Sequence, residues 1–181
     1  MIDNTFLDNF ETTLTAGLKK ICASAGLVDE ELFWTPDFDA KWEEYIKEYI
    51  ADAVSNFNEF PEAAIAWAAY LGLGVAHVWD EDFEKFKLWS YSRYYGSRGW
   101  DDMDEHVLQS ILKLDLDSEE TVKIKNCLLS CATATLGLIR YEGIETQTEA
   151  GFYILARAYS VLFRIGVALE LRRLGYKKVL I

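Results

Sequence analysis

Residues 61–79 read PEAAIAWAAYLGLGVAHVW, and this stretch decides the fold. After Glu62 it carries no formal charge and is apolar on nearly every side, which predicts a helix at the centre of a helical bundle. Ala68, Gly72 and Ala76 lie four residues apart and form a stripe of small residues. Each glycine costs up to about 1 kcal/mol of helix propensity, so close packing against another helix has to offset that cost.

The segments on either side also show the period of an α-helix, and none shows sustained alternation of apolar and polar residues. No linker rich in proline, glycine or serine divides the chain, so residues 1–181 are expected to form a single all-helical globular domain. We predict an all-α fold, a bundle of six or seven mostly antiparallel helices with a central apolar helix and a long C-terminal helix. The expected helices are residues 5–25, 36–57, 61–79, 81–89, 102–113, 118–141 and 147–174.

Short polar residues mark the expected helix starts. Asp80, Asp101 and Asp117 each precede an apolar periodic segment and are predicted N-caps. Thr146 and Glu149 have the spacing of a capping box, so the long C-terminal helix is expected to begin just after Thr146.

The charge is strongly acidic and unevenly distributed. The net charge is −12, and residues 121–181 carry 9 bases and 4 acids while the rest of the chain is acidic. Binding of nucleic acid needs a clustered basic surface, so nucleic acid is not an expected partner. An acidic surface favours a basic protein partner, or serves solubility alone.

Three cysteines, Cys22, Cys127 and Cys131, are too few for a disulfide scaffold. Cys127 and Cys131 share a helix face, but no histidine or further cysteine pair completes a zinc motif. The first ten residues contain Asp3 and Asp8, unlike a secretory signal. We therefore expect free, buried and reduced thiols in a cytoplasmic protein.

Two long apolar stretches raise the question of a membrane. Residues 63–79 are at the lower limit of length for a span and lack a flanking basic cluster, and residues 150–169 contain two arginines, which are costly in hydrocarbon. Both stretches are interpreted as core helices, so no membrane association is expected.

The stretch from residue 90 to residue 100, YSRYYGSRGW after Ser90, is rich in the residue types that dominate binding hot spots. It is the predicted contact surface for a protein partner, while salt bridges at the following helix start are the alternative role for its arginines. The predicted binding residues are Tyr91, Arg93, Tyr94, Tyr95, Arg98 and Trp100.

Two acidic clusters, DEDFE at 80–84 and DDMDE at 101–105, support a second interpretation. Glu81 and Glu84, with Asp101 and Asp104, resemble the carboxylate pattern of the all-helical MazG-like nucleotide pyrophosphohydrolases. The resemblance covers about 24 residues, and the third acid is aspartate where that family has glutamate. It implies Mg²⁺ held between carboxylates on neighbouring helices, whereas helix starts attract acids without any ligand.

Two arginines of the C-terminal helix, Arg157 and Arg164, need carboxylate partners if they are buried. Glu142, Glu145 or an acid of the region 81–113 is the expected partner. A structural ion-pair network is favoured over an anion-binding site.

No nucleophile elbow, phosphate-binding loop or Glu-x-x-His pair is present, so no catalytic residue is assigned. The leading hypothesis is a non-enzymatic, cytoplasmic protein-binding module of the adaptor or immunity type, with no cofactor. The alternative is a Mg²⁺-dependent hydrolase that uses the two acidic clusters. A homo-oligomeric scaffold is the second alternative, and a single-metal site built from two histidine–aspartate pairs is a further one. Those pairs are His77 with Asp80 and Asp102 with His106.

Overall fold

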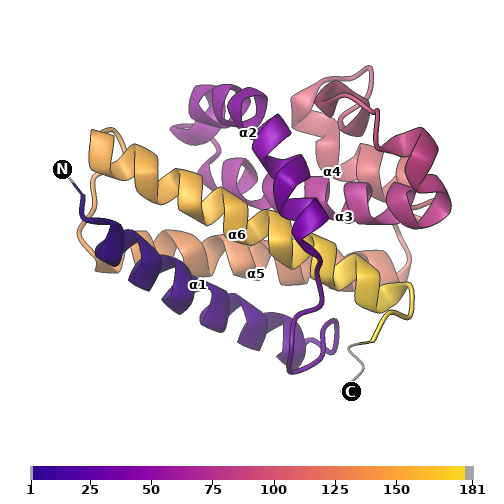
Figure 1. The fold of residues 1–181 in the computed structure, drawn as a ribbon, viewed down its shortest axis with the longest axis horizontal. Helices are drawn as coiled ribbons and strands as arrows, with labels where there is room; N and C mark the ends of the chain where they lie inside the picture. The colour runs from indigo at the N-terminus through magenta and orange to yellow at the C-terminus, as the bar shows by residue number, and fades with distance from the viewer. Residues whose placement is uncertain (1, 178–181) are drawn as a thin grey trace.

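The computed structural model describes residues 2–177, and every regular element within them is helical (Figure 1). The all-α bundle predicted from the sequence is confirmed. Met1 and residues 178–181, which the predicted single domain includes, lie outside the described residues. The α-helices are α1 (Asn4–Ser24), α2 (Pro36–Phe57), α3 (Pro61–Phe86), α4 (Met103–Glu105), α5 (Glu119–Tyr141) and α6 (Glu149–Arg173).

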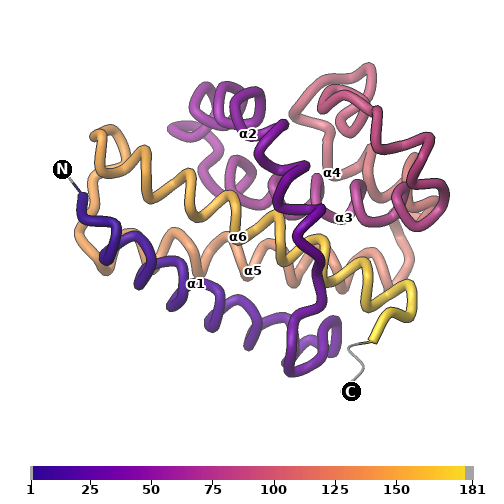
Figure 2. The backbone as a smooth tube through the Cα atoms, viewed as in Figure 1, coloured from indigo at the N-terminus to yellow at the C-terminus, as the bar shows by residue number. Residues whose placement is uncertain are grey.

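The path of the chain places α1, α5 and α6 side by side (Figure 2). α5 runs opposite to α1 and α6, which run in the same direction. α3 lies against α6, and this pair forms the most extensive helix–helix contact of the structure. The buried core is centred on α3, which contacts α2, α5, α6 and the segment 91–111.

The contact between α3 and α6 depends on the small residues expected there. A Cβ atom at Gly72 would lie 2.2 Å from the carbonyl oxygen of Phe163, and one at Gly166 would lie 1.9 Å from the carbonyl oxygen of Ala69. Both distances are far shorter than any real contact, so the two backbones touch at this crossing. The close helix approach predicted from Ala68, Gly72 and Ala76 is confirmed, with α6 as the partner.

Four helix caps differ from those predicted, and two of them are those of α5 and α6. α6 begins after Thr148, whose hydroxyl accepts a hydrogen bond from the Gly151 amide, so the prediction of Thr146 is wrong. α5 is capped by Ser118 in place of Asp117. In both cases the observed cap is a hydroxyl that accepts a hydrogen bond from an amide of the first helical turn, which has no partner inside the helix.

The segment 80–113 is less regular than the two helices predicted for it. α3 continues to Phe86 with a break at Asp82 (φ −162°, ψ 91°), whose carboxylate accepts a hydrogen bond from the Lys85 amide. The cap is therefore Asp82, and the prediction of Asp80 is wrong. The helix predicted at 102–113 is formed by α4 and a π-helical turn, His106–Ile111. Asp101 lies inside the 3₁₀ turn Trp100–Asp102 that precedes them, so the prediction of Asp101 as a cap is wrong.

The apolar length of two helices, α5 and α6, would suffice to cross a membrane. The most apolar window is 67% buried inside the bundle in α6 and 44% buried in α5. Length and composition alone are weak evidence for a membrane span.

Ion pairs connect the basic α6 to acidic helices. Arg157 contacts Asp8 and Glu11 of α1, and Arg164 contacts Glu11 and Asp39. The expectation of an ion-pair network is confirmed. The expected partners, which were Glu142, Glu145 or an acid of the helices predicted at 81–89 and 102–113, are wrong. The reason is that α6 lies next to α1 along this face.

Candidate functional site

The predicted binding stretch 90–100 folds against the core. Tyr91, Tyr94 and Trp100 are buried, with exposed fractions of 1%, 0% and 9%. These three side chains do not reach solvent, so their predicted direct contact with a partner is wrong. Arg93 and Arg98 are exposed and Tyr95 is half-buried, and of the six predicted residues only these three face solvent.

The inward orientation of this stretch follows from its local conformation. Residues Tyr91–Tyr94 form a 3₁₀ turn, in which side chains three residues apart lie on the same side. The Tyr91 hydroxyl donates a hydrogen bond to the Asp52 carboxylate (2.9 Å), and Tyr94 packs against the bare backbone of Gly74. Burial raises the pKa of both phenols, because the phenolate form is poorly solvated there.

Exposed parts of the stretch take part in salt bridges. The guanidinium of Arg98 contacts Asp102 (3.7 Å) and Glu105 (2.9 Å) in the following helical segment, as the alternative role of the loop arginines predicts. Arg93 stacks over the ring of Trp89.

The buried Trp100 contacts Trp67 of α3. Its carbonyl oxygen accepts a hydrogen bond from the indole nitrogen of Trp67 (2.8 Å), and the two indoles are in contact. Trp67 also packs edge-to-face on Tyr70. The stretch 90–100 therefore fixes the orientation of Trp67, a half-buried residue of α3.

Trp67 forms one wall of an apolar groove of about 400 Å³ between α3 and α5, which we call the α3–α5 groove. Phe60 and Leu129 lie on its two sides and are 52% and 54% exposed. Its apolar lining consists of Phe60, Ala63, Ala66, Trp67, Tyr70 and Leu129. Its polar lining consists of Glu59, Glu62, Asp104, Lys125 and Asn126.

The electrostatics of the groove are set by its carboxylates. Burial raises the pKa of Asp104, although the amide of Glu105 and the ammonium of Lys125 act in the opposite direction. A carboxylate that is partly withdrawn from water in this way is stabilised by an incoming cation.

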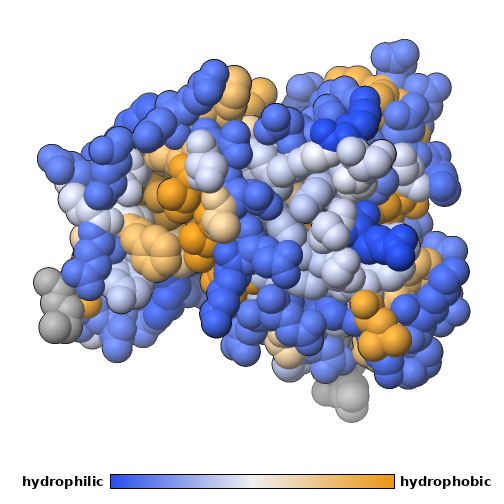
Figure 3. Space-filling model, turned by 90° about the horizontal axis from the view of Figure 1, so that it is seen from above, coloured by the Kyte–Doolittle hydropathy of each residue, from blue (hydrophilic) through white to orange (hydrophobic). Residues whose placement is uncertain are grey.

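A second hollow, of about 510 Å³, lies where α5 ends and α6 begins. On this side of the molecule, at the left of Figure 3, hydrophobic residues lie between hydrophilic ones. The hollow has a buried apolar floor of Leu136 and Ile139, and the amide of Gln147 donates a hydrogen bond to Asn58 across it. It therefore presents less exposed apolar surface than the α3–α5 groove.

The four carboxylates of the metal hypothesis do not meet. Glu81, Glu84 and Asp101 are exposed, Glu84 is paired with Lys87 (2.6 Å), and Asp104 faces the α3–α5 groove. Among residues 2–177, no group of three or more acids or histidines gathers its ligand atoms closely enough for a metal ion. The predicted Mg²⁺ site of Glu81, Glu84, Asp101 and Asp104 is therefore wrong: Glu84 pairs with Lys87, and Asp101 and Asp104 lie in the first turns of short helices.

The two histidines also have separate structural roles. His77 contacts the fully buried carboxylate of Glu170 (3.1 Å), which Arg173 holds with two hydrogen bonds. His106 donates a hydrogen bond to the carbonyl oxygen of Arg93 (3.2 Å). The single-metal site of His77, Asp80, Asp102 and His106 is not formed.

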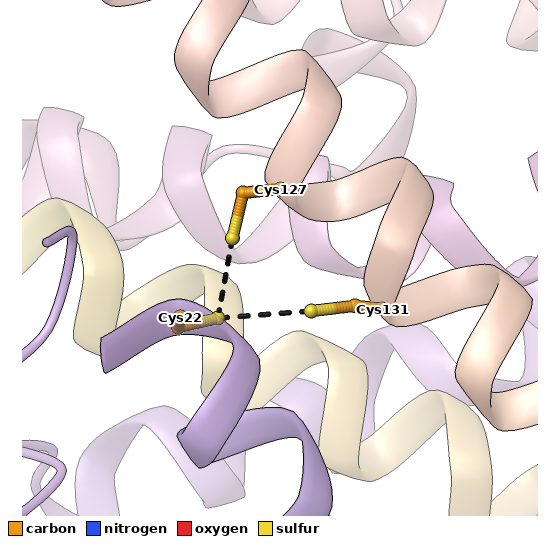
Figure 4. A group of neighbouring side chains, drawn as sticks. All are labelled: Cys22, Cys127 and Cys131. Atoms are coloured by element: carbon orange, nitrogen blue, oxygen red, sulfur yellow. Dashed lines mark hydrogen bonds between the residues drawn. The ribbon is translucent and has the colours of Figure 1, made fainter. Parts of the chain in front are cut away.

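The one cluster in residues 2–177 with the geometry of a metal site consists of the three cysteines, Cys22, Cys127 and Cys131 (Figure 4). Their burial, which the sequence predicts, is confirmed. Their meeting at one point was missed, because Cys22 lies more than a hundred residues from the other two.

Comparison with protein families, curated proteins and solved structures finds no significant match to this chain, so its function has to be argued from its own geometry.

Proposed function

We propose that this chain is a non-enzymatic protein-binding module, and that the α3–α5 groove receives an amphipathic helix with basic flanks. The observation that carries the proposal is the pair of exposed apolar side chains, Phe60 and Leu129, on either side of the half-buried Trp67. Scattered exposed apolar residues need no explanation, but a contiguous apolar groove with a polar rim is typical of a protein-interaction site.

The shape of the groove favours a helix as the occupant. Helices α3 and α5 supply most of its walls, and six of its eleven lining residues are apolar. Amphipathic helices bind such grooves through apolar residues at positions i, i+3 or i+4, and i+7. A wall that is already fixed lowers the entropic cost of binding, and the hydrogen bond from Trp67 to Trp100 provides such a wall.

The charge of the rim selects a basic partner. Three carboxylates, those of Glu59, Glu62 and Asp104, line the groove against one ammonium, that of Lys125. The net charge of −12 adds a long-range attraction for cations. Lysine or arginine beside the apolar stripe of a partner would meet these carboxylates, whereas glutamate would be repelled.

The three free thiols are consistent with a reducing compartment, and we place the module in the cytoplasm.

The test uses synthetic helical peptides that share one leucine stripe and differ only in their flanks, lysine in one and glutamate in the other. Fluorescence anisotropy measures binding to the whole chain. We expect micromolar affinity for the lysine peptide, weakening at high salt, and at least about tenfold weaker affinity for the glutamate peptide. Equal binding of both peptides, or none by either, contradicts the proposal.

Two matched variants locate the binding site. Leu129→Asp places a charge in the groove, and Leu88→Asp places the same charge at a side chain that is 80% exposed outside it. We expect only Leu129→Asp to weaken binding of the lysine peptide, by about tenfold or more. Circular dichroism should show that both variants are folded. Equal effects of the two variants would refute the assignment to the groove.

Light scattering distinguishes a homo-oligomer from a module that binds a basic partner. A stable dimer that Leu129→Asp converts to a monomer would show that a second copy occupies the groove, and it would overturn the proposal of a basic partner. A monomer at the concentrations used for the binding assay supports the proposal of a basic partner.

A further inference from the structure

Three sulfur atoms from two helices meet inside the bundle. The Sγ atom of Cys22 in α1 lies 3.5 Å from that of Cys127 and 3.6 Å from that of Cys131, both in α5. All three sulfurs lie within 4.8 Å of one another, and Figure 4 shows them pointing toward a common centre. These are the three cysteines of the chain.

The separations suit a metal ion bound by all three sulfurs. With metal–sulfur bonds of about 2.3 Å, as in zinc thiolates, separations of 3.5 and 3.6 Å correspond to sulfur–metal–sulfur angles of about 100°. The third pair of sulfurs, those of Cys127 and Cys131, lies within 4.8 Å. We propose that Cys22, Cys127 and Cys131 form a three-sulfur site for one soft, thiophilic metal ion that joins α1 to α5.

The surroundings of the sulfurs favour a trivalent ion. The three cysteines are buried, with exposed fractions of 0%, 4% and 0%, and the hydrogen bonds of their sulfurs in the described chain are with one another. Burial of an uncompensated charge is costly. Three thiolates neutralise a trivalent ion such as arsenic(III), leave one negative charge with Zn²⁺ and leave two with Cu⁺.

The protonation of the cluster agrees with this chemistry. Hydrogen bonds with Cys131 and Cys22 lower the pKa of Cys127. Hydrogen bonding to Cys127 and burial raise the pKa of Cys22 and Cys131. Binding of a metal ion to thiols releases their protons.

With arsenous acid the reaction is a ligand exchange. Three sulfur–arsenic bonds replace three oxygen–arsenic bonds, and each thiol proton leaves with one hydroxide as water. No atom is oxidised or reduced.

Access to the sulfurs requires only a local opening. Cys22 lies in the last turn of α1, which ends at Ser24, and Gly26 then turns the chain with φ +74°. Opening of one helical turn is far less costly than unfolding of the bundle, and it exposes the Cys22 thiol.

The first experiment adds sodium arsenite to the whole chain in a phosphine reductant that contains no thiol. Native mass spectrometry should show one arsenic atom gained and three hydrogens lost, and X-ray absorption should count three sulfur neighbours. The melting temperature should rise, because the ion binds only the folded cluster. Two parallel samples receive no arsenite, and one of them receives Cu⁺ and the other Zn²⁺.

Variants then identify the ligands. Cys22→Ala and Cys131→Ala should each weaken arsenite binding by about 100-fold or more, since loss of a residue that merely supports a ligand already costs 10–100-fold. Thr135→Val is the control, because it alters α5 one turn from Cys131 and leaves all three sulfurs in place. If an alanine variant fails to fold, the sulfur count of the unaltered chain still decides the question.

Failure of all three ions to bind at micromolar concentration, or a count below three sulfurs, overturns the proposal. Three-sulfur binding of Cu⁺ without arsenite supports the site and refutes the charge argument for a trivalent ion.

Discussion

Replacement of Gly166 by alanine tests the closest contact of the fold. The new methyl group would lie 1.9 Å from the Ala69 carbonyl oxygen, whereas ordinary contacts begin near 3.4 Å. The obstructing atoms belong to the backbone of α3, so no flexible side chain can move aside. The helices α3 and α6 would have to separate by more than an ångström along the centre of the core.

The size of the effect follows from two opposed contributions. Alanine improves helix propensity by about 1 kcal/mol relative to glycine. Overpacking of a core costs typically 1–3 kcal/mol and more where backbone must move, and the separation also weakens dispersion contacts along both helices. We expect a net loss of about 2 kcal/mol, a large part of the roughly 5–15 kcal/mol that stabilises a typical domain.

The assay is urea unfolding followed by circular dichroism, with Gly17→Ala and Gly137→Ala as controls. Neither control glycine has an atom from another part of the chain within 4 Å of the position that the new methyl group would take, so both substitutions should stabilise the protein by about 0.5–1 kcal/mol. The urea concentration at the midpoint of unfolding should fall for Gly166→Ala and rise for the controls. The dependence of the unfolding free energy on urea concentration should stay the same in all variants. A rise for Gly166→Ala would refute the close crossing of α3 and α6.

Two further predictions concern charges. Arg164→Met removes contacts of 2.8 Å to both Asp39 and Glu11, so we expect a loss of about 1–2 kcal/mol that shrinks at high salt, measured by urea unfolding. Arg172→Met, which removes an exposed 3.4 Å pair, should change stability by less than about 0.5 kcal/mol, and equal losses would contradict the network. Because burial raises the pKa of Asp104, the folded protein binds its proton more tightly than the unfolded chain, and this stabilising contribution is lost as the pH rises through the raised pKa. Asp104→Asn should therefore raise the melting temperature at about pH 7 and have little effect at about pH 4, and the reverse order would show that the pKa is not raised.

The helical architecture could be predicted because it depends on local patterns. The apolar stretch 61–79 predicted a central helix, and the small residues around Gly72 predicted a close crossing. Caps were harder, because Thr146 and Thr148 both offer a hydroxyl and only the path of the backbone decides between them.

The candidate sites could be predicted only in part. Composition marked the stretch 90–100 but could not show that Tyr91 and Tyr94 point inward, although their spacing of three residues is what a 3₁₀ turn would place on one side. Cys127 and Cys131 were paired from their spacing, while Cys22 joins them only through the packing of α1 on α5. Likewise, the α3–α5 groove combines residues of three separate segments, and such a combination has no signal in local sequence.

The most direct test of the proposed docking groove is a titration of the isotope-labelled chain with the lysine-flanked peptide, followed by the indole resonances of its six tryptophans. The Trp67 indole, which lines the groove and is hydrogen-bonded to Trp100, should shift progressively with peptide, while that of Trp34, outside the groove, stays in place. Shifts at Trp34 with none at Trp67, or no shifts at saturating peptide, would contradict the account.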